Sequence, residues 1–281
     1  MQKTTDAAEL SQLARRMRRT AIEMITEAKS GHPGGSLSVA EIIVTLFLDV
    51  LKHDPANPTW KDRDRFILSK GHCCPMLYAV MAECGYTPKD QLNTLRKLGS
   101  IYQGHPDVRF IPALEASTGS LGQGLSIGIG MALSARLDNS DARTYVVLGD
   151  GEIQEGQIWE AVMFAAHHKV DNLISTIDWN GQQIDGPTEK VIGLGNIREK
   201  FAAFGWATLE MNGNDMDDVI KVLAEAKALT GKGRPIAILM HTIMGKGVDF
   251  MENDHNWHGI APNDDQLAKA LAQLPTPLKD Y

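Results

Sequence analysis

The sequence has 281 residues, of which 43% are hydrophobic, so it can bury one large core, and we expect a single domain over residues 1–281. Its 28 Lys and Arg residues against 35 Asp and Glu residues give a net charge of -7, which argues against a nucleic-acid partner. No segment has the apolar run of a signal peptide or the roughly 20 apolar residues of a membrane span, so we expect a cytoplasmic protein without a membrane partner.

Helical and strand patterns alternate along the chain. Apolar residues at helical spacing predict an amphipathic helix from Leu10 to Ala28, which ends at Gly31 and Pro33, and a second helix from about Val39 to Leu51. Short apolar runs then predict buried strands, separated by helical patterns; the strands are Phe66–Leu68, Tyr145–Leu148, Leu173–Ile177, Trp206–Met211 and Pro235–Met240, and the helices include Ile158–Ala165 and Asp215–Leu229. Continuously apolar strands separated by helices predict an α/β fold, with a parallel sheet flanked by helices on both faces.

Polar residues follow three of these predicted strands directly. His72 follows the first strand, Asp150 lies in Gly149-Asp150-Gly151 after the second, and Asn180 follows the third. Ligands of parallel sheets bind outside the carboxyl ends of the strands, so we expect the three side chains along one edge of the sheet.

Two of these strand ends suit a magnesium ion. Mg²⁺ takes oxygen ligands from one or two protein groups, together with phosphate oxygens and water. Asp150 offers a carboxylate, Asn180 a neutral amide oxygen, and a backbone carbonyl near Gln182 a third oxygen. Gly-Asp-Gly and Asn-Gly are each common turn sequences on their own, but their place at successive strand ends favours a metal site.

Two other kinds of site are not favoured. The glycine-rich stretch Gly119–Gly124 does not match G-x-G-x-x-G, and the residues before it, Pro112–Thr118, have no strand pattern, which argues against a dinucleotide site. Cys73, Cys74 and Cys84 form no C-x-x-C pair, so neither a disulfide framework nor a zinc ribbon is expected.

Four of the nine histidines stand next to glycine or proline in predicted loops: His32, His72, His105 and His258. Imidazoles in such loops can donate to oxyanions, bind sugar hydroxyls and move protons near neutral pH. Each alone fits a turn residue, but four around one metal loop favour a functional role. We interpret the other five as structural or solvated; these are His53, His167, His168, His241 and His255. No pair has the spacing of an H-E-x-x-H zinc helix.

Seven segments, in order, resemble the diphosphate-binding domain of transketolase, in the thiamine diphosphate enzyme superfamily, over nearly the whole chain: KSGHPGGSLS, ILSKGH, GHP, TGSLGQGLSIGIGMA, GDGEIQEGQIWEA, DWNGQQIDG and GKGVDFMENDHNWHG. Each segment is weak alone, but their order and spacing are specific. The resemblance implies a transferase of the pentose phosphate pathway type, which moves a two-carbon ketol unit from a ketose (phosphate) to an aldose (phosphate). It also implies thiamine diphosphate and Mg²⁺ as cofactors, with Ca²⁺ or Mn²⁺ as substitutes.

The resemblance assigns roles to particular residues. Asp150, Asn180 and the Gln182 carbonyl would ligate the metal, and His32, His105 and His258 would bind the donor ketose and move protons. The cofactor contacts it implies are His72, Gly119, Ser120, Leu121, Asp150, Gly151, Glu155, Asn180 and His258. Glu155, also a candidate catalytic residue, and Glu160 stand where the family has an interface between domains, although the solvated face of a helix explains them equally well. Ser120 departs from the proline of many relatives, which predicts a less rigid loop.

Transketolases of full length have two further domains, one of which supplies the glutamate and the aromatic ring that contact the aminopyrimidine. We therefore expect a partner chain, a C-terminal transketolase subunit with the pyrimidine-binding domain, in a heterotetramer with two copies of each subunit. Four alternatives stay open: an E1-type subunit of a 2-oxo acid dehydrogenase, 1-deoxyxylulose 5-phosphate synthase, a transketolase for a specialised sugar, and a non-catalytic scaffold that retains the fold.

Overall fold

A five-stranded parallel sheet forms the centre of the molecule in the computed structural model, which describes residues 3–279. The strands lie in the order β1 (Arg65–Leu68), β2 (Thr144–Gly149), β3 (Leu173–Trp179), β7 (Ile236–His241) and β6 (Ala207–Asn212). The register pairs Gly149 with Asp178 and Trp179 with His241, so β2, β3 and β7 end at the same edge of the sheet.

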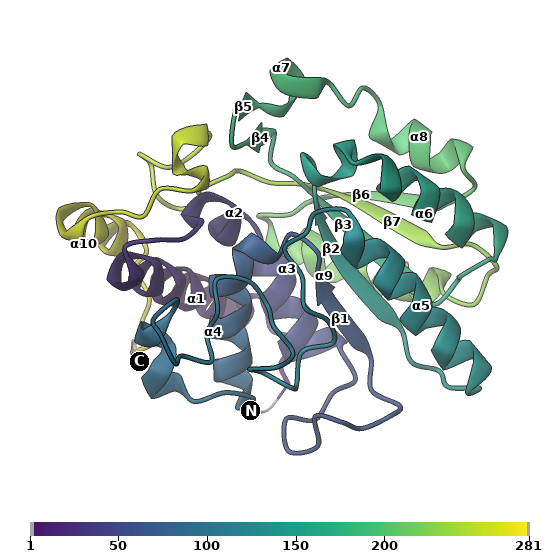
Figure 1. Cartoon of the computed structure of the whole chain (residues 1–281), viewed down its shortest axis with the longest axis horizontal. Coiled ribbons are helices and arrows are strands. Elements are labelled where there is room, and N and C mark those ends of the chain that lie inside the picture. The colour runs from purple at the N-terminus through teal and green to yellow at the C-terminus, as the bar shows by residue number, and fades with distance from the viewer. Residues whose placement is uncertain (1–2, 280–281) are drawn as a thin grey trace.

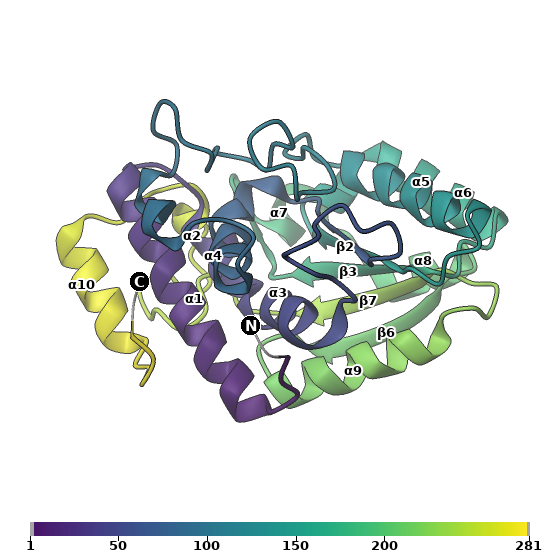
Figure 2. The same cartoon turned by 90° about the horizontal axis from the view of Figure 1, so that it is seen from below.

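Helices cover both faces of this sheet, as Figure 2 shows from the side. One face carries α1 (Ala7–Ala28), α3 (Ala40–Thr45), α4 (Cys74–Cys84) and α9 (Met216–Leu229), and the other carries α5 (Gln123–Leu137), α6 (Gly156–His167) and α8 (Ile197–Ala203). Side chains alternate along each strand: Val147 packs in the first apolar cluster and Val146 in the second. The predicted fold class is confirmed.

Short elements surround this framework (Figure 1). They are α2 (Pro33–Ser38), α7 (Thr188–Ile192), the antiparallel pair β4 (Gln182–Gln183) and β5 (Gly186–Pro187), the 3₁₀ helices η2 (Gly71–Cys73), η3 (Lys89–Thr94), η4 (Glu152–Gln154) and η5 (His255–His258), and the π-helix η1 (Leu46–Val50). The last helix, α10 (Asp264–Gln273), packs against α1 at the margin of the molecule. Among the described residues, no helix combines the length and the apolar character that crossing a bilayer requires.

The second predicted helix differs from the prediction. It begins earlier, at Pro33, is interrupted at Val39, and ends in a π-helical turn that Leu51 closes by donating its N–H to the Leu46 carbonyl. The first helix ends at Ala28, before Gly31 and Pro33, as predicted. Pro33 occupies the first position of the next helix, α2, where its fixed φ and missing N–H are compatible with a helix start. His32 is thereby held at the N-terminus of α2, beside the edge of the sheet. All three cysteines are buried and free.

Candidate active site

A cavity of about 350 Å³ opens at the carboxyl edge of the sheet. The predicted site residues that line it are His32, His72, His105, Gly119, Leu121, Asp150, Gly151, Glu155, Asn180, Gln182 and His258. They come from segments up to 226 residues apart in the chain (258 minus 32), which the parallel topology brings to one edge. Ser120 is the exception among the predicted residues: it is exposed and does not line the cavity.

Asp150 is buried at the end of β2 and is held by its neighbours. Its Oδ1 accepts a hydrogen bond from the Gly151 N–H (2.7 Å), and its Oδ2 accepts from the Gly181 N–H (2.7 Å) and the Thr188 hydroxyl (3.3 Å). Burial, and then the charge of Asp178, raise the pKa of the Asp150 carboxyl to about 6, although the two amides oppose that shift. A nearby cation would favour the ionised form, so this carboxylate is suited to hold one.

Asn180 lies at the end of the neighbouring strand β3, and its carboxamide has a fixed orientation. Its Nδ2 donates to Asp178 Oδ2 (3.0 Å), and its Oδ1 accepts from the Gln182 N–H (3.0 Å). Gly181, at φ +74°, makes the turn into β4 that places Gln182 at the cavity.

The oxygens of these three residues suit a hard cation. One carboxylate, one carboxamide and one backbone carbonyl form the kind of oxygen set that Mg²⁺ accepts, with phosphate and water completing the coordination. Among the described residues, no group of three or more His, Cys, Asp or Glu side chains is arranged to hold a metal ion. A cation held by Asp150, Asn180 and the Gln182 carbonyl would have one carboxylate and two neutral oxygens as its protein ligands.

The four loop histidines form one cluster. The centroid of the His32 ring lies 5.0 Å from that of His72, 5.7 Å from His258 and 6.5 Å from His105. Burial, with the nearby positive groups, lowers the pKa of His32 to about 4. Burial, and then Lys70, lower that of His258 to about 4. The pKa values of His72 and His105 are also lowered, with burial as the first cause. These lowered pKa values keep the imidazoles in the neutral form at pH 7, in which each ring has one nitrogen that donates a hydrogen bond and one that accepts.

Two buried nitrogens in this cluster lack a hydrogen-bond partner within residues 3–279, namely Nδ1 of His32 and Nδ1 of His258. Buried polar atoms in native proteins are almost always paired, and an unpaired one calls for an explanation. A polar ligand in the cavity would supply the missing partners.

The loop that contains Gly119 and Leu121 packs directly on the histidine cluster. Gly119 has φ +130°, and a Cβ there would lie 2.5 Å from Cδ2 of His105, so both backbone and space require glycine. The Tyr78 hydroxyl donates to the His105 carbonyl (3.0 Å) and holds the other side of that segment. Leu121 lies at the rim of the cavity with 37% of its surface exposed, so the loop presents an apolar side chain at the opening.

Three buried charged residues at this edge were not predicted. Glu152 accepts hydrogen bonds from the Ser69 hydroxyl and from the N–H groups of Gly122 (2.9 Å) and Gly149 (3.0 Å). Lys70 and Asp178 form a buried ion pair at 2.5 Å. Burial alone would lower the pKa of Lys70, but the Asp178 carboxylate raises it. A charged residue next to the end of an apolar strand is the pattern that could have indicated these three residues. Each lies within three positions of the end of β1, β2 or β3.

The two glutamates of α6 are exposed. Glu155 precedes the first turn of α6 and lines the cavity, whereas Glu160 lies on an adjoining apolar groove with Ile129, Leu133 and Phe164. Neither side chain caps the helix. Glu160 therefore lines this groove and not the cavity of the candidate site.

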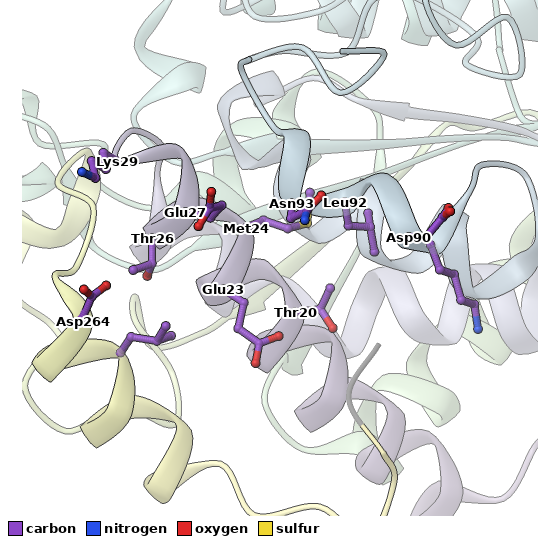
Figure 3. A pocket seen from close by; sticks show the side chains of 12 residues that line it. Thr20, Glu23, Met24, Thr26, Glu27, Lys29, Asp90, Leu92, Asn93 and Asp264 are labelled. Carbon is purple, nitrogen blue, oxygen red and sulfur yellow. The ribbon is translucent and has the colours of Figure 1, made fainter.

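A second cavity, of about 580 Å³, lies between α1, η3 and α10 (Figure 3). Acidic and basic side chains line it together, among them Glu23, Glu27, Lys29 and Asp90. It includes none of the predicted site residues and lies among helices at the side of the molecule. The smaller cavity at the strand ends is therefore the candidate active site.

The fold and this cavity define a parallel α/β domain with a polar, histidine-lined cavity at its strand ends. The chain belongs to the family described as transketolase, thiamine diphosphate binding domain, whose profile matches residues 10–276.

Relatives match it along most of its length. It is 41% identical to an apulose-4-phosphate transketolase subunit of Phocaeicola vulgatus, over 92% of this chain and 90% of that protein. It is 40% identical to the 6-deoxy-6-sulfo-D-fructose transketolase subunit SqwG of Clostridium sp., over 95% of this chain and 96% of that protein. The structure of transketolase from Leishmania mexicana is similar with a TM-score of 0.89 and 33% identity, over 96% of this chain and 42% of that one. The chain thus spans about two fifths of such full-length transketolases.

Proposed function

We propose that this chain is the N-terminal subunit of a split transketolase, which moves a two-carbon ketol unit from a ketose or its phosphate to an aldose or its phosphate. One observation carries the proposal: Asp150, Asn180, Gln182 and the four loop histidines line a single cavity at the strand ends. Relatives that are named transketolase subunits and match over 90% or more of their own length support it.

The proposed cofactors are thiamine diphosphate and Mg²⁺, with Ca²⁺ or Mn²⁺ as substitutes. Asp150, Asn180 and the Gln182 carbonyl would hold the ion, and Gly151, His72 and the unpaired nitrogen of His258 would contact the cofactor. When bound, thiamine diphosphate supplies the electron sink of the reaction. The anchored carboxylate and the unpaired histidine nitrogens support this fit.

The chain's own residues would then orient the sugar and move protons. His32, His105 and His258 are neutral imidazoles that line the cavity, and each would exchange a proton with a sugar hydroxyl. The backbone of Gly119 and Ser120 and the Leu121 side chain would face the aminopyrimidine. Glu155, exposed at the rim, would meet the second subunit.

The partner we propose is a C-terminal transketolase subunit that carries the pyrimidine-binding domain, in a heterotetramer with two copies of each chain. The apolar groove between α5 and α6 supports such a partner, because Phe164, which lines it, is 45% exposed, and the neighbouring Met163 is 57% exposed. Exposed apolar patches of this kind mark protein interfaces.

A reconstitution assay tests the proposal. The chain is purified with and without the partner, and ketol transfer from ketose to aldose is measured with thiamine diphosphate and Mg²⁺. We expect transfer only from the two subunits together, since residues 10–276 match the thiamine diphosphate binding domain and the proposed partner would supply the pyrimidine site. Full activity of this chain by itself would contradict the split arrangement. Activity of the pair on a 2-oxo acid but not on a ketose would instead assign the E1-type alternative, and failure of the pair to bind thiamine diphosphate would assign the scaffold.

A further inference from the structure

The buried carboxylate of Asp178 joins four separate parts of the chain. Its Oδ2 accepts from the Ser38 hydroxyl (2.7 Å), Lys70 Nζ (2.5 Å) and Asn180 Nδ2 (3.0 Å), and its Oδ1 accepts from the Thr242 hydroxyl. Asp178 is completely buried and does not line the candidate site. Its side chain therefore acts through its neighbours and not by touching a ligand.

The hydrogen bonds from Ser38, Lys70 and Thr242 fix the position of the Asp178 carboxylate. Ser38 ends α2, Lys70 follows β1, and Thr242 follows β7, so three elements hold Asp178 from different directions. A buried charge is tolerated when it is paired and its remaining hydrogen-bonding positions are filled, and both conditions are met here. Asp178 therefore offers the Asn180 NH₂ group a hydrogen-bond acceptor whose position is fixed.

This acceptor decides which way the Asn180 carboxamide points. The two ends of a carboxamide are almost equal in size, but one donates hydrogen bonds and the other accepts them. A carboxylate only accepts, so it admits the NH₂ end and repels the oxygen. The Gln182 N–H donates to Asn180 Oδ1 and favours the same orientation from the other side.

We propose that Asp178 is a positioning residue that presents the Asn180 carboxamide oxygen to the divalent cation of the site. The inference rests on the proposed function, in which Asn180 is a metal ligand. Without Asp178, the carboxamide is free to turn its NH₂ end toward the cation, where it cannot bind. An asparagine at position 178 does not restore the constraint, because its own amide can present either a donor or an acceptor.

A double-mutant cycle on metal affinity tests the inference. Mn²⁺ binding is measured by electron paramagnetic resonance on the full chain with its partner, at saturating thiamine diphosphate, for the wild type, Asp178→Asn, Asn180→Ala and the double variant. We expect each single change to weaken Mn²⁺ binding by about 10- to 100-fold, and Asp178→Asn to add at most about a further twofold when residue 180 is alanine. Losses that multiply in the double variant, or a single Asp178→Asn variant with wild-type affinity, would overturn the inference.

Two further variants keep the test decisive. Thr242→Val removes one of the three donors that hold Asp178, but the carboxylate and its contacts with Ser38 and Lys70 remain to orient Asn180, so we expect Mn²⁺ affinity to fall by at most about twofold; a loss as large as that of Asp178→Asn would point to a general disturbance and overturn the inference. If Asp178→Asn does not fold, Lys70→Gln combined with Asp178→Asn removes both buried charges. The effect of this double change on Mn²⁺ affinity is measured once with Asn180 present and once with alanine at position 180. Equal losses of affinity in the two backgrounds would overturn the inference.

The same measurements separate this inference from the proposed function. Asp150→Ala reports on the metal site directly. If Asp150→Ala and Asn180→Ala both bind Mn²⁺ as the wild type does, the metal assignment is wrong and the role of Asp178 with it. If both lose affinity while Asp178→Asn does not, only the positioning role is wrong.

Discussion

The protonation of His32 illustrates how the site is arranged at the scale of single residues. Its ring packs against His72 and His258, and burial lowers its pKa from 6.5 to about 4. The folded protein therefore binds a proton at His32 less tightly than the unfolded chain does. The stability that this neutral imidazole contributes is present above pH 6.5 and is lost as the pH falls from 6.5 toward 4.

Replacement of His32 by Gln should reduce this dependence on pH. Between pH 7 and pH 4.5, we expect the wild type to lose on the order of 1 kcal/mol more unfolding free energy than His32→Gln does. Urea unfolding of both proteins across that range measures the difference. Carboxyls with raised pKa values, such as Asp150, act in the opposite direction, but they are common to both proteins and cancel. Parallel pH profiles would show that His32 is not held neutral by burial.

At the scale of elements, the carboxylate of Glu152 connects the ends of two strands with the start of α5. It joins the residue after β1 (Ser69), the last residue of β2 (Gly149) and the residue before α5 (Gly122). Because Gly122 follows Gly119 and Leu121, which line the cavity, this contact anchors the C-terminal end of their loop.

Glu152→Gln should be destabilising although it is nearly isosteric. Three donors point at two carboxylate oxygens, and the NH₂ group of glutamine would face one of them without accepting its hydrogen bond. We expect a loss of about 2 kcal/mol in unfolding free energy by urea denaturation. Glu160→Gln, an exposed change on α6, is the matched control, with an expected effect within about 0.5 kcal/mol. Equal effects of the two changes would mean that the Glu152 contacts contribute no stability.

The sequence was sufficient for the elements whose patterns are local. Apolar runs predicted all five strands of the main sheet, because most strand positions in β1, β2, β3 and β7 are buried between the two helical layers. The edge strand β6 is only partly buried, and its run is accordingly interrupted by Thr208 and Glu210. The break at Val39 and the start of α2 at Pro33 were not predicted, because tertiary packing and not apolar spacing determines them. The same limit applies to the short pair β4 and β5, which has two residues in each strand.

The site was predictable where the topology dictates it. Residues directly after parallel strands must meet at one edge, so Asp150, Asn180 and His72 could be placed together from the sequence. The Lys70–Asp178 pair joins residues 108 positions apart, and no local pattern indicates which buried lysine meets which aspartate. Such pairs depend on the order of the strands, which apolar runs do not encode.

At the scale of the whole molecule, the groove between α5 and α6 is the surface that we expect to bind the second subunit. Phe164→Asp places a charge at its centre and should weaken association with the partner, because a charge in an apolar interface is left without water or a counterion. Copurification and analytical ultracentrifugation of the pair measure this. Leu137→Asp is the matched control, since Leu137 is 84% exposed at the far end of α5 and does not line the groove. Unchanged association of Phe164→Asp would place the partner on another surface.

Distant segments of the chain assemble the cavity. The divalent cation that they are proposed to hold is the feature on which the proposed function depends most. The most direct test is a crystal structure of the two subunits with thiamine diphosphate and Mn²⁺, with the ion located by its anomalous scattering. We expect one strong peak between the Asp150 carboxylate, the Asn180 carboxamide oxygen and the Gln182 carbonyl, with diphosphate oxygens completing its coordination. A bound cofactor whose ion lies away from these three residues would contradict the account.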